Sequence, residues 1–330
     1  MPIKISRLKP KTVEGWLILV IIGLAIFFTS QSDSFFTIRN FLDLAESYSV
    51  TGIFALGLFV VLIIGGIDIS FAAIASVTQY MVAALVMSMG FDSALFTISF
   101  SILLGIGFGF INAILVYHFK IISIIVTISM QSLLFGLLMW ATNGRSLYDL
   151  PEWIFEFYQV LPFSVGEQSY MIGLPLTVLL GLTLLTWFVL SKTSLGRKIY
   201  ASGGDMESAR RVGIKVGAIH FIAYGFCGAM AAIGGLVQVY RMGEVVPNAL
   251  VGTELNVLAA VVLGGASLSG GKGTVFGTLL GVFLVGMLNN GLNIIGVSNY
   301  FVDVAVGLVI IAAITITHYG KRRETDVSFG

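Results

Sequence analysis

The sequence predicts an all-α, polytopic integral membrane protein with about ten transmembrane helices, some of them broken, and three observations predict it. Hydrophobic residues make up 57% of the 330 residues and charged residues only 11%, against about 25% charged residues in a soluble domain. The apolar residues form long runs, most of which approach the ~20 residues that a helix needs to span a bilayer. The basic residues gather at the ends that this topology places in the cytoplasm.

Ten apolar runs are the expected helices of a single membrane domain, residues 1–330. An even number of spans places both termini on one side. Fifteen of the eighteen Lys and Arg residues then fall at cytoplasmic ends, and only Arg39, Arg145 and Arg241 fall at outer ends. The N- and C-termini are therefore expected in the cytoplasm. The expected helices are residues 15–32, 44–64, 68–88, 95–117, 121–141, 171–190, 216–240, 253–265, 274–292 and 299–318.

The sequence GGIDIS, residues 65–70, interrupts the apolar pattern at the start of the third expected helix. Gly65 and Gly66 allow the backbone to break or to approach a neighbour closely, and Asp68 follows at membrane depth. A carboxylate there costs roughly 2.5–3.5 kcal/mol on insertion scales, so it is a candidate for function. The alternative is that Asp68 caps the broken helix by accepting from N–H groups that the glycines release. Both interpretations remain open from the sequence.

The fourth expected helix contains the sequence GIGFGFINAILV. Gly105, Gly107 and Gly109 offer a close-packing face, which is the usual role of small residues in membrane helices. Asn112 is a polar group in the same helix, and it serves either as an interhelical hydrogen bond or as a ligand contact. The same choice applies to Gln79 and Gln131.

Residues 142–170 are the one sizeable outer loop. Acidic residues outnumber Arg145, the only basic residue of the loop, and aromatic residues cluster at 153–158. Aromatic side chains collect at the headgroup boundary of a membrane. The loop is therefore expected to be an interfacial helix or an irregular segment.

The central loop, residues 192–215, is the longest hydrophilic stretch between membrane segments and is basic, so we expect it in the cytoplasm. Within it, Asp205 is a good N-cap, Glu207 and two arginines lie at the ends that suit the helix dipole, and Gly213 is a C-cap. These signals predict a helix at 206–212 that is too short to be stable alone. It either packs on its own protein or docks on a partner.

The sequence VLGGASLSGGKGTVFGTLLG, residues 262–281, nearly matches a phosphate-binding loop. That motif needs glycine where Ala266 stands, Ser or Thr after the lysine where Gly273 stands, and a position between a strand and a helix. This is therefore not a nucleotide site. The sequence VVLGGASLS also resembles LIIGGIDIS, and Gly264 and Gly265 align with Gly65 and Gly66. This similarity suggests two related halves.

Other function classes find little support. A net charge of +1 suggests no nucleic-acid partner, and the single Cys227 cannot form an internal disulfide. The three histidines do not cluster in sequence, so no metal site is expected. No nucleophile–base pair is present, so we expect no enzymatic activity.

Three stretches carry a resemblance to a known family: GGIDIS, the central TSLGRKIYASGGDMESARRVGIKV, and VLGGASLSGGKGTVFGTLLG. From roughly residue 40 to 318 the chain resembles the permease subunits of bacterial ATP-binding-cassette importers of the ribose, xylose and galactose type, a simple-sugar family that also includes autoinducer-2 permeases. The resemblance implies that the short central helix sits in a cleft of a separate ATPase subunit, which binds ATP and magnesium. The residues implied in this coupling are Gly203, Gly204, Asp205, Glu207, Ala209 and Arg210.

The resemblance implies two further protein partners in a bacterial plasma membrane, besides membrane lipid. A periplasmic or lipoprotein solute-binding protein would dock on the outer face, where Arg145 and Arg241 are candidates to pair with its carboxylates. A second permease copy or a paralogue would complete the pathway. No cofactor is expected in this chain.

The expected function is import of a monosaccharide or a similar small polar solute. An ion-coupled secondary transporter is the alternative, but it needs an intramembrane charged network, for which only Asp68, Glu254 and Asp303 are available. An intramembrane enzyme or a scaffold is a third possibility with less support. The candidates for the pathway and the broken helices are Gly65, Gly66, Asp68, Ser70, Asn112, Gln131, Gly264 and Gly265.

Overall fold

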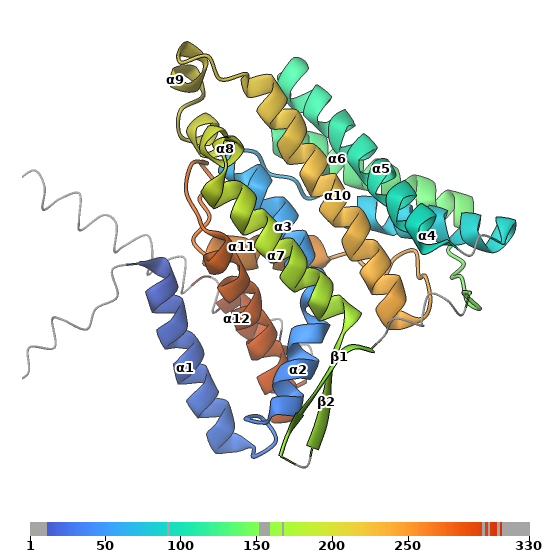
Figure 1. Ribbon diagram of the computed structural model, residues 1–330, viewed down its shortest axis with the longest axis vertical. Helices are drawn as coiled ribbons and strands as arrows, with labels where there is room; N and C mark the ends of the chain where they lie inside the picture. The colour runs from blue at the N-terminus through green and yellow to red at the C-terminus, as the bar shows by residue number, and fades with distance from the viewer. Residues whose placement is uncertain are drawn as a thin grey trace, which may run out of the picture.

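The computed structural model describes residues 12–90, 93–151, 159–166, 168–298, 301–302, 304–308 and 311. This part of the chain is mostly helical, with one two-stranded hairpin (Figure 1). In chain order the elements are α1 (Val13–Gln31), α2 (Ile38–Ser47), α3 (Ser49–Ile63), α4 (Phe71–Met89), α5 (Ala94–Ala113) with a π-helical turn (Ile114–His118), α6 (Ser123–Thr142), β1 (Gln159–Val165), β2 (Gln168–Gly173), α7 (Leu174–Lys192), α8 (Ser194–Gly204), α9 (Met206–Arg211), α10 (Val216–Met242), α11 (Thr253–Leu263) and α12 (Val275–Ile294).

Helix α3 is the centre of the bundle. Every one of its residues except Thr51 is buried, as expected of a helix that is apolar on all sides. It packs against α10, α11, α12 and α7. Because α3 ends at Ile63, it leads directly into the GGIDIS segment, in which Gly65 is exposed and residues 68–70 are buried.

Seven helices in the described residues are long and apolar enough to cross a membrane, and the pair α2 and α3, bent by 49°, is an eighth candidate. The expected helix 44–64 is therefore part of a bent pair. Helix α11 has 11 residues, which span about 16 Å of a hydrocarbon core about 30 Å thick. The expected helix 299–318 lies mostly outside the described residues.

Helices α5 and α10 pack most extensively, and glycines of both helices allow it. A Cβ at Gly105 would lie 2.2 Å from the carbonyl oxygen of Gly228, and one at Gly109 would lie 2.2 Å from that of Tyr224. Gly107 has no atom within 4 Å of its Cβ position. The prediction that Gly107 shares this face is wrong, because only residues four apart lie on one side of the helix.

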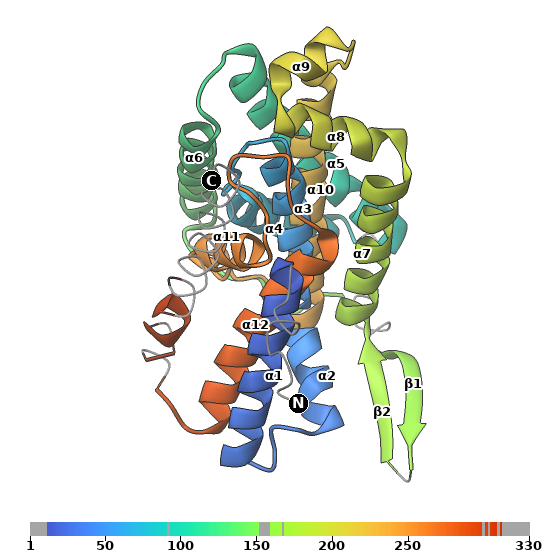
Figure 2. The ribbon, with the colours of Figure 1, turned by 90° about the vertical axis from the view of Figure 1, so that its left-hand side faces the viewer.

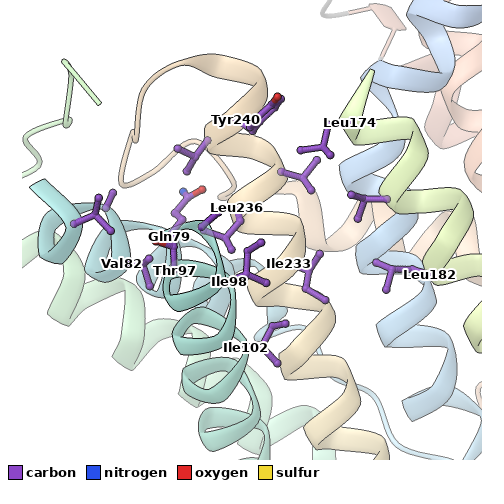
Figure 3. A pocket seen from close by; sticks show the side chains of 16 residues that line it. Gln79, Val82, Thr97, Ile98, Ile102, Leu174, Leu182, Ile233, Leu236 and Tyr240 are labelled. Atoms are coloured by element: carbon purple, nitrogen blue, oxygen red, sulfur yellow. The ribbon is translucent and has the colours of Figure 1, made fainter. Parts of the chain in front are cut away.

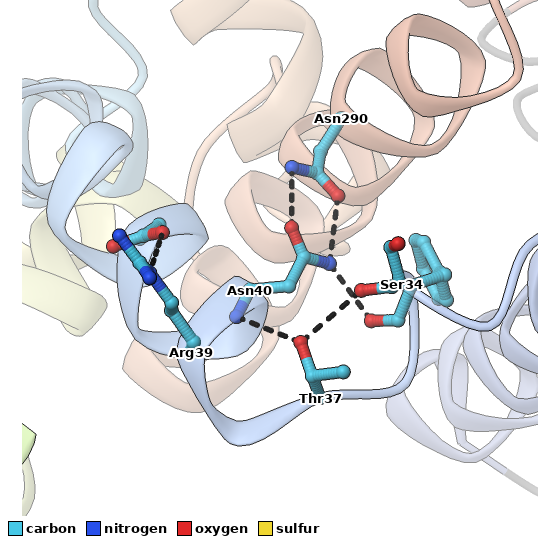
Figure 4. A network of polar contacts seen from close by, with 7 residues as sticks. Ser34, Thr37, Arg39, Asn40 and Asn290 are labelled. Atoms are coloured by element: carbon cyan, nitrogen blue, oxygen red, sulfur yellow. Dashed lines mark hydrogen bonds and ion pairs between the residues drawn. The ribbon is translucent and has the colours of Figure 1, made fainter.

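Helices α1 and α12 run side by side, with α2 next to them (Figure 2). At the end of this group, Asn40 of α2 and Asn290 of α12 exchange two side-chain hydrogen bonds of 3.1 and 3.0 Å (Figure 4). Such pairs of amides hold membrane helices together. The asparagines at the C-terminal end of α12 thus include an interhelical contact.

The outer loop contains a β-hairpin that the sequence analysis missed. Strands β1 and β2 are antiparallel, with Val165 opposite Gln168. The connection begins at Gly166, whose φ of +63° suits a tight hairpin turn. The aromatic cluster at 153–158 lies outside the described residues.

Candidate functional site

The central loop folds into two short helices, α8 and α9, at one end of the bundle (Figure 1). Asp205 separates them and caps α9, since its carboxylate accepts from the N–H of Glu207 at 3.0 Å and of Ser208 at 3.1 Å. The Ser208 hydroxyl also donates to this carboxylate, and these hydrogen bonds lower the pKa of Asp205. The predicted helix and its N-cap are confirmed, and the preceding helix α8 is an addition to the prediction.

Helix α9 exposes nearly all of its side chains. Ala209 is its only buried residue, whereas Met206 is 40% exposed and Val212, just after the helix, is 77% exposed. Glu207 is exposed and lies 3.6 Å from Arg211 in an exposed ion pair, which contributes little stability. The helix thus presents both apolar and charged groups outward.

Arg210 points back to its own chain. Its Nη2 donates to the hydroxyl of Tyr117 at 3.4 Å, and its guanidinium lies 5.9 Å from the centre of the tyrosine ring. Tyr117 belongs to the π-helical turn after α5. Arg210 therefore joins α9 to the end of α5, in addition to any contact with a partner.

The end of α8 touches the end of α3 backbone to backbone. A Cβ at Gly203 would lie 1.6 Å from the carbonyl oxygen of Ile63, which no other residue type could tolerate. The same carbonyl accepts from the N–H of Gly271 at 2.8 Å. A Cβ at Gly271 would lie 2.7 Å from the Cα of Gly204. We call these contacts of Ile63, Gly203, Gly204, Gly270 and Gly271 the glycine junction.

Helices α3 and α11 end in the same way. The N–H groups of Gly65 and Gly66 donate to the carbonyls of Leu62 and Val61, and Gly65 has a φ of +81°. This is the Schellman motif, which needs a left-handed residue after the helix. In α11 the N–H groups of Gly265 and Ala266 donate to the carbonyls of Val262 and Val261, and Gly265 has a φ of +91°.

The two segments therefore share a helix ending, which is shifted by one residue from the match of the sequence letters. Gly65 corresponds to Gly265, and not to Gly264 as the aligned letters suggest. Gly264 packs on α12, where a Cβ would lie 2.4 Å from the carbonyl oxygen of Gly277. It has a packing role between α11 and α12.

Asp68 lies fully buried in the break between α3 and α4. Its Oδ1 accepts from the Ser70 N–H at 2.9 Å and from the Ser70 hydroxyl at 2.7 Å, and Asn112 donates to its Oδ2 at 3.4 Å and to the Ser70 hydroxyl at 2.8 Å. The prediction that Asp68 caps the broken helix is wrong, because the glycine N–H groups bond to α3. Asp68 accepts instead from Ser70, the N-cap residue of α4, and α4 has no side-chain cap among the described residues. Asn112 ties the break to α5, and its own Oδ1 is buried without a partner.

Helix α6 carries a polar face that the sequence analysis did not recognise. The Ser123 hydroxyl accepts from the Ile67 N–H at 3.0 Å, and the Thr127 hydroxyl donates to the Ile67 carbonyl at 3.2 Å. Gln131 follows one turn later and donates to Glu254 of α11 at 2.6 Å. The four-residue spacing of these polar residues was the available signal, since it places them on one side of a helix.

A cavity of about 190 Å³ lies beside Gln131, next to the first residues of α4. The polar groups in its wall are the side chains of Gln131 and Ser132, and Phe135 adds an aromatic ring. The remaining lining residues are Ala72, Ala73 and Val251.

A larger cavity of about 290 Å³ lies between α4, α5, α7 and α10 (Figure 3). Its wall is almost entirely aliphatic, with Gln79, Thr97 and Tyr240 as its polar residues. A polar solute would find few hydrogen-bond partners there. The smaller cavity is therefore the better candidate for a solute.

The two outer arginines differ in their surroundings. Arg241 donates to the carbonyl oxygen and to the hydroxyl of Ser47, both at 3.1 Å, at the bend between α2 and α3. A cation at the C-terminus of α2 is favoured by the helix dipole. The Arg145 side chain is exposed, and its carbonyl accepts from the Tyr80 hydroxyl at 3.0 Å. The side chain of Arg145 is therefore more accessible to another protein than that of Arg241.

The predicted residues thus form three groups. Gly203, Gly204 and the α9 residues lie at one end, where the glycine junction joins them to α3. Asp68, Ser70 and Asn112 form one hydrogen-bonded cluster a few residues beyond that junction. Gln131 pairs with Glu254 instead, and Asp303 lies outside the described residues.

Comparison with known proteins gives consistent matches over nearly the whole chain. Residues 40–314 match the family described as branched-chain amino acid transport system / permease component. The chain is 36% identical over 318 residues to the ribose import permease protein RbsC of Escherichia coli (strain K12), covering 92% of this chain and 94% of the relative. No solved structure was found to match.

Two further relatives are named for other solutes. The D-allose transport system permease protein AlsC of Escherichia coli (strain K12) is 32% identical, with 92% of this chain and 90% of the relative covered. The autoinducer 2 import system permease protein LsrC of Yersinia enterocolitica is 30% identical, with 91% of this chain and 81% of the relative covered.

Proposed function

The chain belongs to the family of branched-chain amino acid transport system permease components, and we propose that it is the permease subunit of an ATP-binding-cassette importer for a monosaccharide or a similar small polar solute. Like the permeases that it resembles, it is a transport component and not an enzyme. The family description refers to amino acids. Among the relatives that match nine-tenths of this chain, RbsC and AlsC are named for ribose and allose, and LsrC is named for autoinducer 2. We follow the two sugar permeases for the solute, because their identities of 36% and 32% exceed the 30% of LsrC.

The remaining features of the importer are part of the proposal. We place the chain in a bacterial inner membrane with ten spans and with both termini in the cytoplasm. The ten spans would be the eight candidates described above, α11 and the segment 299–318. A separate ATPase subunit would bind α9, a solute-binding protein would dock near Arg145, and a second copy or a paralogue would complete the pathway.

The single observation that carries the proposal is the position of α8 and α9. Helix α9 is exposed and carries both apolar and charged side chains, so it suits a protein partner. Helix α8 contacts the carbonyl of Ile63 with no side chain between, and Ile63 lies two residues before Gly65. A partner that moves α9 would therefore move the end of α3 and, through it, the Asp68 cluster.

Purification of the tagged chain from its native host in mild detergent tests the proposal. We expect an ATPase subunit to copurify with the native chain and to be lost with Glu207→Arg, because the substitution reverses an exposed charge on α9. Arg39→Glu is the control, since it reverses an equally exposed charge on α2. The variants should have unchanged membrane abundance and melting temperature.

Two results would contradict this function. If the Glu207→Arg variant retained the ATPase and transported normally, α9 would not be the docking element. If the native chain purified alone and exchanged solute across vesicle membranes without ATP, it would be an ion-coupled secondary transporter.

A further inference from the structure

We propose that Gln131 binds a hydroxyl group of the transported solute and that Glu254 is the positioning residue that fixes which end of the Gln131 amide meets it. The inference rests on the proposed function and specifies its solute as a neutral, polyhydroxylated molecule. Its basis is the geometry of the contact between α6 and α11, next to the cavity that Gln131, Ser132 and Phe135 line.

Glu254 is held in place from its own helix. It is only 8% exposed, and its Oε2 accepts from the Gly252 N–H at 2.9 Å at the start of α11. No ion pair links it to a Lys or Arg in the described residues. Its other oxygen, Oε1, accepts from Gln131 at 2.6 Å. Both carboxylate oxygens thus act as acceptors, one toward α11 and one toward α6.

This arrangement decides the orientation of the Gln131 amide. An ionised carboxylate can only accept hydrogen bonds, so it must meet the NH₂ end of the amide. The carbonyl end, Oε1, is left as an acceptor for another molecule. An acceptor at a cavity selects solutes with O–H or N–H donors, and it disfavours anions such as phosphorylated sugars, which a nearby carboxylate also repels.

The cavity fits this class of solute in size and in lining. Its volume of about 190 Å³ equals roughly six times the ~30 Å³ that one water occupies in the liquid, which suits a small solute. The Ser132 hydroxyl can both donate and accept, and Phe135 provides an apolar face. No charged residue lines the cavity, so a cationic solute finds no direct ion pair there.

The test measures uptake of ribose and of its monodeoxy analogues by the chain and its copurified partners in vesicles, with the solute-binding protein saturated by each sugar in turn. Saturation removes the selectivity of the binding protein from the comparison. We expect the native chain to transport ribose faster than at least one deoxy analogue, by about three- to tenfold, as the loss of one hydrogen bond implies.

Gln131→Leu should abolish that preference, because leucine has no acceptor. Glu254→Gln should weaken it while preserving a hydrogen bond between α6 and α11, because a glutamine at 254 allows the Gln131 amide to turn either way. Leu137→Ala is the control on the same helix, since Leu137 is exposed and does not line the cavity. Copurification of the ATPase should be the same for all four proteins.

An unchanged preference in Gln131→Leu, with uptake intact, would overturn the inference and leave the proposed function standing. A Glu254→Gln variant that equals the native chain in preference would remove the positioning role of Glu254. A native chain that transports none of these sugars would overturn ribose as its solute, and failure of the same comparison with allose and its deoxy analogues would overturn the monosaccharide function and this inference together.

Discussion

At the scale of the residue, Asp68 shows how a buried carboxylate is satisfied without a cation. In the described residues Ser70 and Asn112 donate hydrogen bonds to it and carry no charge, and Cys227 is a further hydrogen-bonding neighbour. The carboxylate therefore joins the N-cap residue of α4 to α5. This supports a structural role at the break.

Substitution at Asp68 separates the charge of the carboxylate from its hydrogen bonds. Asp68→Asn keeps an oxygen that accepts from Ser70, and Asn112 can turn its free Oδ1 toward the new amide, so we expect transport to be largely retained. Asp68→Leu leaves buried donors of Ser70 and Asn112 unsatisfied, at about 1–3 kcal/mol each, so we expect loss of transport and a lower melting temperature. Equal loss of transport in both variants would show that the charge itself is required. Uptake and melting temperature in detergent are the measurements.

At the scale of the element, the sequence predicted the membrane helices well because each signal is local. Apolar runs define α1, α4, α5, α6, α7, α10 and α12, and the Asp205 cap defines α9. The hairpin at 159–173, helix α8 and the bend at Ser47 were missed. The bend depends on contacts between distant segments, such as the Arg241 hydrogen bonds at Ser47, which no local pattern reveals. Helix α8 and the hairpin had local signals that were overlooked, the Thr193 N-cap and the turn at Gly166.

The same limit explains the partial success at the functional residues. Asp68 and the α9 residues were found because a carboxylate in an apolar run and a capped hydrophilic helix are conspicuous. Ser123 and Thr127 were overlooked because hydroxyl groups are common in membrane helices. Only their spacing with Gln131 marks them as one polar face.

The glycines of α5 give a matched test of packing. Gly109→Leu places a large side chain where a Cβ alone would lie 2.2 Å from the Tyr224 carbonyl, so α5 and α10 must separate. We expect a loss of roughly 1–3 kcal/mol, as for overpacked cores. Gly107→Leu points away from α10 and should leave stability unchanged or slightly improved. Melting temperatures in detergent compare the two, and equal destabilisation would show that α5 is rotated from the described position.

At the scale of the whole molecule, two segments far apart in the chain have the same local form and meet. Helices α3 and α11 both end in a Schellman motif, and each is followed by a short irregular segment and a long helix, α4 or α12. The first segment forms the Asp68 cluster. The second supplies Gly270 and Gly271 to the glycine junction. A Cβ at Gly270 would lie 2.9 Å from the nitrogen of Gly65, so the two irregular segments touch where the central loop meets the bundle.

The glycine junction predicts that binding of the ATPase to α9 and transmission of its movement to α3 can be separated by mutation. Gly203→Ala adds a Cβ that would lie 1.6 Å from the Ile63 carbonyl oxygen, so α8 must shift away from α3. Helix α9 keeps its Asp205 cap, so the ATPase should still copurify, while transport should fall by about tenfold or more, as expected when coupling weakens by ~1.4 kcal/mol.

Gly204→Ala is the matched comparison, because its Cβ position has no atom of the described residues within 4 Å, apart from its chain neighbours and its own helix backbone. Its ratio of transport to bound ATPase should equal that of the native chain, whatever its effect on docking. The measurement is that ratio in vesicles for the three proteins. If Gly203→Ala retained the native ratio, the movement of α9 would have to reach the Asp68 cluster by another route, of which the Arg210 contact with Tyr117 is the one that the structure offers.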